Sequence, residues 1–123
     1  MSVNYGQGSG QQIVTCHPKG DENGGLFTVK EKEGGEMCQT GNPVKCGDVI
    51  RLEHMETSKN VHSHDVRSPL SGKSEVSGFG DDGEGDNGDD WKIECLNSAT
   101  GLMVNNGEVI KGSTVIQLRH DVT

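Results

Sequence analysis

Short runs of alternating apolar and polar residues recur along the chain. In each run two apolar residues flank one polar or charged position, and these pairs are Phe27/Val29, Ile50/Leu52, Trp91/Ile93 and Ile116/Leu118. A period of two is typical of a β-strand that buries one face. No window keeps the spacing of three and four residues that an amphipathic helix needs. We therefore predict an all-β fold made of short strands.

Turn-forming residues separate these strands. The clearest turns are Gly24-Gly25, Gly34-Gly35, Gly41-Asn42-Pro43, Pro69-Leu70-Ser71-Gly72 and Asn105-Asn106-Gly107. Glycine and asparagine accept the positive φ of tight turns, and proline presets φ for the others. Many short strands in a repeated order favour a closed β architecture, because separate hairpins would not hold so sparse a core.

The strands belong to an internal repeat. Ser9–Thr15 (SGQQIVT) shares the pattern of Ser71–Ser77 (SGKSEVS), 62 positions later. Two further pairs match in the same order, Phe27–Val29 with Trp91–Ile93 and Lys45–His54 with Lys111–His120. Residues that match across a repeat are expected to serve the fold.

Composition narrows the range of functions. Of the 123 residues, 29% are hydrophobic, 3% are aromatic and 19 are glycine, so the core must be small. The net charge of −8 disfavours a nucleic-acid partner, because phosphate binding needs an excess of lysine and arginine. No apolar run is long enough to span a bilayer.

Four cysteines are present, and none forms the C-x-x-C pair of a zinc ribbon. Cys46 precedes the predicted strand Val49–Leu52, and Cys95 follows the predicted strand Trp91–Ile93. If these strands pair antiparallel, the cysteines lie opposite each other and a Cys46–Cys95 disulfide is geometrically possible. Such a bond would favour an oxidising compartment. The alternative is four buried free thiols.

His62 and His64 alternate on a predicted strand, so both imidazoles lie on one face. They are the candidate metal ligands of this chain, and His54 is a third histidine that could face the same side. The alternative is a structural strand held by hydrogen bonds. The match of His54 with His120 across the repeat favours that alternative.

Asp81–Asp90 holds six carboxylates in ten residues. Calcium binds such oxygen-rich loops, but the spacing departs from that of an EF-hand. We expect a solvated acidic loop that repels itself and stays mobile, with a basic partner surface as the alternative.

Trp91, the sole tryptophan, and its counterpart Phe27 are expected in the core, with a ligand-stacking Trp91 as the alternative. Catalysis finds little support. Ser63 lies between two histidines, but neighbouring strand residues point to opposite faces. No glycine-rich loop precedes a helix to cradle phosphate. We expect no enzyme activity and no cofactor.

The central part of the chain resembles an MIR motif. The residues that carry this resemblance are Pro43–His54, Thr57, Asn60–His64, Ser68–Gly72, Glu75–Ser77, Phe79–Gly80 and Asp89–Trp91. They look like those of the stromal-cell-derived-factor-2-like family. The resemblance implies a β-trefoil of three MIR repeats, of which we expect about two here. These are the remainder of a first repeat (1–40), a complete central repeat (41–97) and the start of a third (98–123). An incomplete trefoil leaves unpaired strand edges.

The resemblance also implies a function. It predicts a non-catalytic interaction module for protein folding and quality control in the lumen of the endoplasmic reticulum. Its partners would be a J-domain co-chaperone and BiP, or unfolded clients. The interaction residues are expected in exposed loops, namely Arg67, Ser68, Pro69, Asp81, Asp82, Glu84 and Asp86. The alternative is a module that binds glycans or glycoproteins, of the kind found in O-mannosyltransferases.

Overall fold

The computed structural model describes residues 3–16, 18 and 23–123. Its strands are β1 (Gln12–Ile13), β2 (Phe27–Glu31), β3 (Val49–His54), β4 (Asn60–Arg67), β5 (Ser74–Phe79), β6 (Trp91–Leu96) and β7 (Val115–His120). Two single-turn 3-10 helices, η1 (Asn23–Gly25) and η2 (Asn87–Asp89), are the helices of the described part, and neither could span a bilayer. The prediction of an all-β fold is confirmed.

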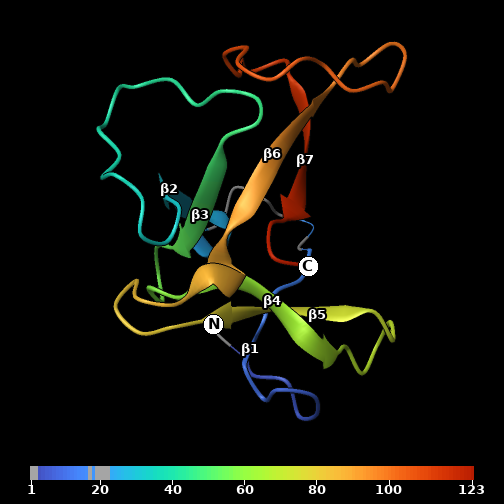
Figure 1. Ribbon diagram of the computed structural model, residues 1–123. Helices are drawn as coiled ribbons and strands as arrows, with labels where there is room; N and C mark the ends of the chain where they lie inside the picture. The colour runs from blue at the N-terminus through green and yellow to red at the C-terminus, as the bar shows by residue number, and fades with distance from the viewer. Residues whose placement is uncertain (1–2, 17, 19–22) are drawn as a thin grey trace.

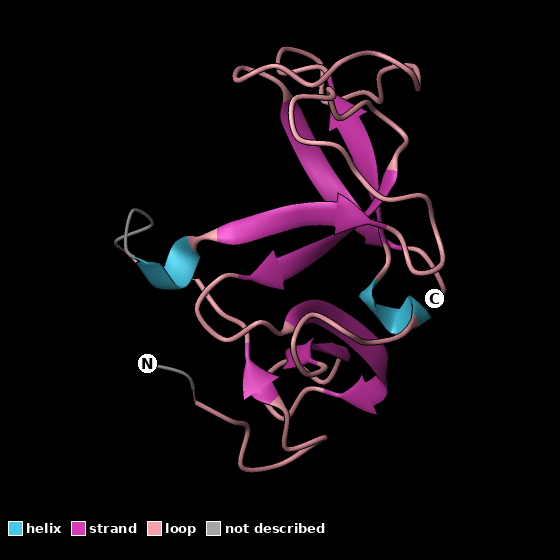
Figure 2. Cartoon of the chain, turned by 90° about the vertical axis from the view of Figure 1, so that its left-hand side faces the viewer, coloured by secondary structure: helices cyan, strands magenta, loops and turns pink. Residues whose placement is uncertain are grey.

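All seven strands form one curled antiparallel sheet (Figure 1). Its order is β1-β5-β4-β3-β6-β7, and β2 lies off this path as a partner of β3. The strand β3 is central because it pairs with β2 along its length, with β6 near its start and with β4 near its end. Figure 2 shows the sheet from the side, with each 3-10 helix next to a strand.

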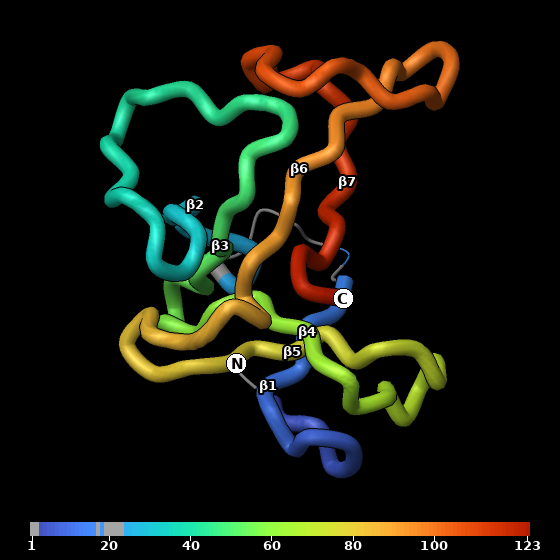
Figure 3. Tube along the Cα trace, in the orientation of Figure 1, coloured from blue at the N-terminus to red at the C-terminus, as the bar shows by residue number. Residues whose placement is uncertain are grey.

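Two long loops project from one end of this sheet (Figure 3). They are residues 32–48, between β2 and β3, and residues 97–114, between β6 and β7. Backbone hydrogen bonds join them, since Cys46 N–H donates to Glu108 O at 2.8 Å and Ile110 N–H donates to Val44 O at 2.9 Å. The loops therefore close the end of the sheet above the small apolar core.

The core is as small as the composition implies. Its buried hydrophobic residues are Cys46, Ile50, Trp91, Ile93 and Cys95. A disulfide joins Cys46 to Cys95, with a Cα–Cα distance of 5.6 Å. The antiparallel pairing of Ile50 with Trp91 brings the two cysteines together. The other two thiols are free and exposed, so the alternative of four buried thiols is wrong.

The sequence repeat is visible in the contacts of the first hairpin, β2–β3. Phe27 packs on His54 with ring centroids 5.2 Å apart. His54 Nε2 donates to the carbonyl of Gly24 at 2.9 Å, since a carbonyl can only accept. In the neutral ring, Nδ1 then accepts from the Thr57 hydroxyl at 2.8 Å.

The second hairpin, β6–β7, repeats each of these contacts. Trp91 packs on His120 at 4.9 Å. His120 Nε2 lies 2.8 Å from Gly88 O, and its Nδ1 lies 2.7 Å from the Thr123 hydroxyl. The matched histidines therefore hold the fold in both hairpins, in agreement with the structural interpretation of His54.

The two matched aromatic residues differ in burial. Trp91 is buried and its indole N–H donates to Val61 O at 2.8 Å, as expected of a core residue. Phe27 is 38% exposed, so the prediction of a core position is wrong for it. The reason is its place on β2, which pairs only with β3 and has no neighbour on its other side among the described residues.

The sheet is open at its edges. β1, β2 and β7 each pair with one strand of the described part. Leu118 of β7 is 37% exposed, whereas Ile93, its partner across the ladder in β6, is 2% exposed. The closed architecture is therefore not reached in these residues, and the unpaired edges expected of an incomplete trefoil are present.

Candidate functional site

The part of the molecule around β4, β5 and η2 has an interior made mainly of polar side chains. Among the residues that the structure describes, ten polar or charged ones are buried, namely Gln12, Arg51, Asn60, His62, Ser63, Glu75, Ser77, Asp89, Asp90 and Glu94. Most of them lie on β4, β5 and η2. Buried polar groups must find partners, so this part is where specific chemistry is to be sought.

The acidic loop folds back onto β4 through a capping box around η2. Asp86 accepts from the backbone N–H of Gly88 at 2.8 Å, and Asp89 Oδ2 accepts from the backbone N–H of Asp86 at 2.9 Å. Each carboxylate thereby satisfies a donor that the short helix leaves free. The result is that Asp89 and Asp90 are buried, so the prediction of a wholly solvated loop is wrong for these two.

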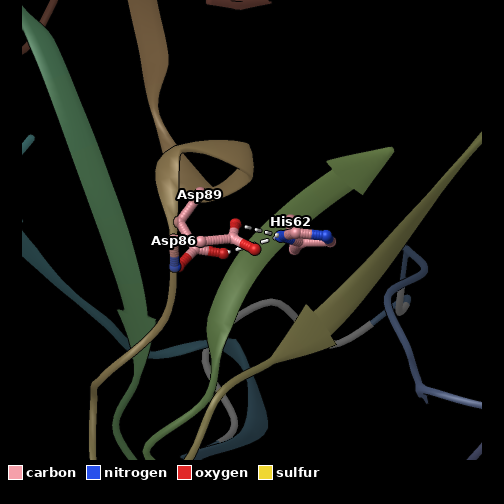
Figure 4. Close-up of side chains that lie close together, drawn as sticks. All are labelled: His62, Asp86 and Asp89. Atoms are coloured by element: carbon pink, nitrogen blue, oxygen red, sulfur yellow. Dashed lines mark hydrogen bonds and ion pairs between the residues drawn. The ribbon is translucent and has the colours of Figure 1, made fainter. Parts of the chain in front are cut away.

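Asp89 and Asp86 converge on one nitrogen of His62 (Figure 4). His62 Nδ1 lies 2.8 Å from Asp89 Oδ1 and 3.6 Å from Asp86 Oδ1. Because a carboxylate accepts, Nδ1 carries the proton in this arrangement. The amide Nδ2 of the buried Asn60 contacts the other oxygen, Asp89 Oδ2, at 3.3 Å.

Glycine at position 88 allows this close approach. A β-carbon there would meet Cε1 of His62 at 2.5 Å and the carboxylate of Asp86 at 3.0 Å. No real β-carbon approaches a neighbour so closely, so a larger residue would push η2 away from β4.

The second histidine of the strand has a carboxylate of its own. His64 Nε2 donates to Glu75 Oε1 at 3.1 Å, and the Ser9 hydroxyl donates to the same oxygen. Burial by itself would raise the pKa of Glu75. The hydrogen bonds from Ser9 and His64 outweigh burial, and the pKa of the carboxyl lies below its usual value.

This contact joins the two copies of the repeated segment. β1 pairs antiparallel with β5, and Ser77 donates to Gln11 Oε1 at 2.6 Å beside the bond from Ser9 to Glu75. The segments that match in sequence therefore pack on each other in space.

The two candidate metal ligands, His62 and His64, contact different carboxylates. His62 and His64 lie on one face with ring centroids 4.9 Å apart, as their alternation predicts. His62 is held by Asp89 and His64 by Glu75. His54, proposed as a further ligand, is held by its own hairpin and lies outside this group.

The predicted interaction residues do not form one patch. Arg67, Ser68 and Pro69 lie where the chain turns from β4 to β5. Asp81, Asp82, Glu84 and Asp86 follow β5 and are exposed. The six residues of β5 hold these groups about 20 Å apart.

Sequence reasoning missed the buried carboxylates Asp89 and Glu75. The repeat contained a signal for both. Glu75 stands where the matched segment has Ile13, and Asp89 stands where the matched turn has Gly25. A carboxylate that replaces an apolar or small residue in a structural repeat marks a position with a partner that the other copy lacks.

The comparisons with known proteins agree with this architecture. The sequence profile of the MIR domain family matches residues 2–123. Stromal cell-derived factor 2 from Homo sapiens is 48% identical over 93 residues, which are 76% of this chain and 44% of that protein. A stromal cell-derived factor 2-like protein from Arabidopsis thaliana is 42% identical over 118 residues, which are 96% of this chain and 50% of that protein. The chain thus spans half or less of the length of these relatives.

Solved structures show the same likeness. The crystal structure of the SDF2-like protein from Arabidopsis thaliana superposes with a TM-score of 0.82 at 42% identity, covering 96% of this chain and 60% of that one. A protein O-mannosyltransferase complex of S. cerevisiae, bound to the sugar donor, gives a TM-score of 0.77 at 28% identity. The match covers 100% of this chain and 17% of that one. The curled sheet with its polar part lies within the matched residues, and the chain belongs to the MIR domain family.

Proposed function

We propose that this chain is a non-catalytic interaction module that serves protein folding and quality control in the lumen of the endoplasmic reticulum. The partners proposed from the family resemblance are a J-domain co-chaperone and BiP, or unfolded clients. The likeness to stromal cell-derived factor 2 over 76% of the chain supports the proposal. A Cys46–Cys95 disulfide fits an oxidising compartment.

The observation that carries the proposal is the ordered turn between β4 and β5. Ser68 N–H donates to Lys73 O at 2.7 Å, and the Ser68 hydroxyl accepts from Leu70 N–H at 3.2 Å. Arg67 Nη1 donates to Gly72 O at 2.7 Å. These bonds hold Leu70 at the tip of the turn with 89% of its surface exposed.

Such a turn is suited to binding another protein. Its own hydrogen bonds fix the conformation in advance, so a partner need not order it on binding. Burial of a leucine side chain in a partner's pocket contributes about 1.5 to 3 kcal/mol, which is the scale of an interface anchor. The acidic residues at the other end of β5 would add electrostatic steering towards a basic surface.

The experiment compares two exposed leucines on different turns. Leu70→Asp is expected to weaken binding to an immobilised J-domain co-chaperone by about tenfold or more. Leu102→Asp, at a 68% exposed position in the loop between β6 and β7, is the matched control and should bind like the unchanged chain. Equal affinities for all three chains, or no binding by any of them, would refute the proposal.

The alternative is a module that binds glycans, and the likeness to the O-mannosyltransferase complex favours it. Sugar sites commonly use an exposed aromatic ring as a stacking surface. Trp91 is buried against β4 and is not available for this role, whereas Phe27 is 38% exposed and could serve it. Binding to mannose-containing glycans on an array, without capture of the co-chaperone, would replace the first proposal by this one.

A further inference from the structure

We propose that His62, Asp86 and Asp89 bind a divalent transition cation, with Zn²⁺ as the preferred ion. The three side chains each offer one ligand atom once Nδ1 of His62 releases its proton to solvent on metal binding, and these atoms lie within 4.8 Å of one another (Figure 4). The separations of 2.8 and 3.6 Å between Nδ1 and the two carboxylate oxygens bracket the value of about 3.3 Å expected around a tetrahedral zinc ion.

The charge of the cluster calls for a cation. Asp89 is fully buried, and a buried carboxylate needs a compensating charge. Among the described residues, His62 is the one basic group within ion-pair distance of Asp86 or Asp89. One imidazolium would leave two carboxylates with a net negative charge, whereas a divalent cation would neutralise both.

A second observation comes from Asn60, which is completely buried next to the cluster. Its Nδ2 contacts Asp89 Oδ2 at 3.3 Å and Gly83 O at 3.2 Å. Its Oδ1 has no hydrogen-bond partner among the described residues. A buried amide oxygen without a donor is costly, so this polar site beside Asp89 needs a donor that the described residues do not supply.

The ligands are already oriented. The capping box fixes both carboxylates through backbone N–H groups, as outer hydrogen bonds do in metal sites. Asp86 is 54% exposed on its side chain, so an ion can enter and keep water in its open positions. One imidazole with two carboxylates suits Zn²⁺ better than Ca²⁺, which prefers oxygen ligands throughout.

The proposal is tested on the full chain with the exposed thiols removed by Cys16→Ser and Cys38→Ser, because free thiolates bind zinc themselves. After treatment with a chelator, calorimetric titration with ZnCl₂ is expected to give one ion per chain. Titration with CaCl₂ should give an affinity at least about tenfold weaker. The Co²⁺ form should show visible bands of nitrogen and oxygen ligands, and His62→Gln should lose them.

The decisive variant is Asp86→Asn, because asparagine keeps the N-cap and removes a charged ligand. It should lower the Zn²⁺ affinity by about tenfold or more while the circular dichroism spectrum stays unchanged. Asp82→Asn, an exposed acid in the same loop, is the matched control and should bind zinc normally. Absence of stoichiometric zinc, or equal affinities for Asp86→Asn and the unchanged chain, would overturn the proposal.

Discussion

At the scale of single residues, burial acts to raise the pKa of two carboxyls, yet their pKa values are shifted in opposite directions. Glu75 is held by Ser9 and His64, and its pKa lies below the usual value. For Asp90, burial raises the pKa, and the hydrogen bond from Glu33 N–H at 2.8 Å offsets this effect only in part. The balance between burial and the donors and charges around each carboxylate therefore decides whether its charge stabilises the fold.

We expect Glu75→Gln to destabilise the fold at neutral pH by about 1 to 3 kcal/mol, because a buried charge-assisted pair of hydrogen bonds is lost. A depressed folded-state pKa contributes stability above the unfolded pKa of about 4.3 and loses it as the pH falls through the folded value. The difference in melting temperature between the two chains should therefore shrink below about pH 4. A constant difference across the acid range would contradict the role of the charge.

Asp90→Asn should change the stability of the fold in the opposite direction, towards a more stable protein at neutral pH. A raised folded-state pKa means that the ionised form is disfavoured in the fold, so the natural residue lowers stability above that pKa. The amide oxygen of asparagine can still accept from Glu33 N–H. We expect the variant to melt at a higher temperature at pH 7 and to converge with the unchanged chain in acid. A lower melting temperature at pH 7 would show that the carboxylate is favourable there.

At the scale of elements, the Cys46–Cys95 bond fastens the loop before β3 to β6. The bond closes a loop with a sequence separation of 49 residues. It lies in the small apolar cluster with Ile50 and Ile93. In so small a core, a covalent link takes over part of the stability that apolar burial supplies in larger domains.

Replacement of both Cys46 and Cys95 by serine is expected to lower the free energy of unfolding by about 4 kcal/mol, from the loop-closure entropy of the denatured chain. Urea denaturation of the oxidised protein measures this change. Cys16→Ser with Cys38→Ser is the matched control, since both thiols are exposed and unbonded. That double variant should unfold at the same urea concentration as the natural chain.

Elements were predicted better than the site, and for a physical reason. The alternation of Trp91 with Ile93 depends on neighbours in the chain, so it located β6 directly. Burial of Asp89 depends on His62, 27 residues away, and burial of Glu75 depends on Ser9, 66 residues away. No local pattern encodes such pairs. The misplacement of Phe27 has the same origin, since its burial would need a strand beyond β2.

At the scale of the whole molecule, an apolar sheet face continues past the buried core to an open edge. Cys95 is opposed across the ladder by Ile116, and Ile93 by Leu118. The first member of each pair is buried and the second is exposed. An edge strand with free backbone groups and apolar side chains is a template for another chain.

We therefore expect the protein to associate with itself as its concentration rises, through β7. Leu118→Lys should reduce this association in sedimentation velocity, because a charge on an edge strand opposes edge-to-edge pairing. Met37→Lys, an exposed loop position, is the control and should leave the association unchanged. If the natural chain stays monomeric at all concentrations, self-association through β7 is excluded.

The contact between the two copies of the repeated segment has a consequence for folding kinetics. The hairpins β4–β5 and β6–β7 join residues close in the chain, whereas β1 must find β5 across more than 60 residues. Closure of so long a loop costs entropy before any contact forms, so β1 docks late. The same reasoning makes it an early segment to detach in native-state fluctuations. Each such opening removes the Ser9 hydroxyl from Glu75 and the Gln11 amide from Ser77, so the carboxylate loses one of its donors whenever the first strand detaches.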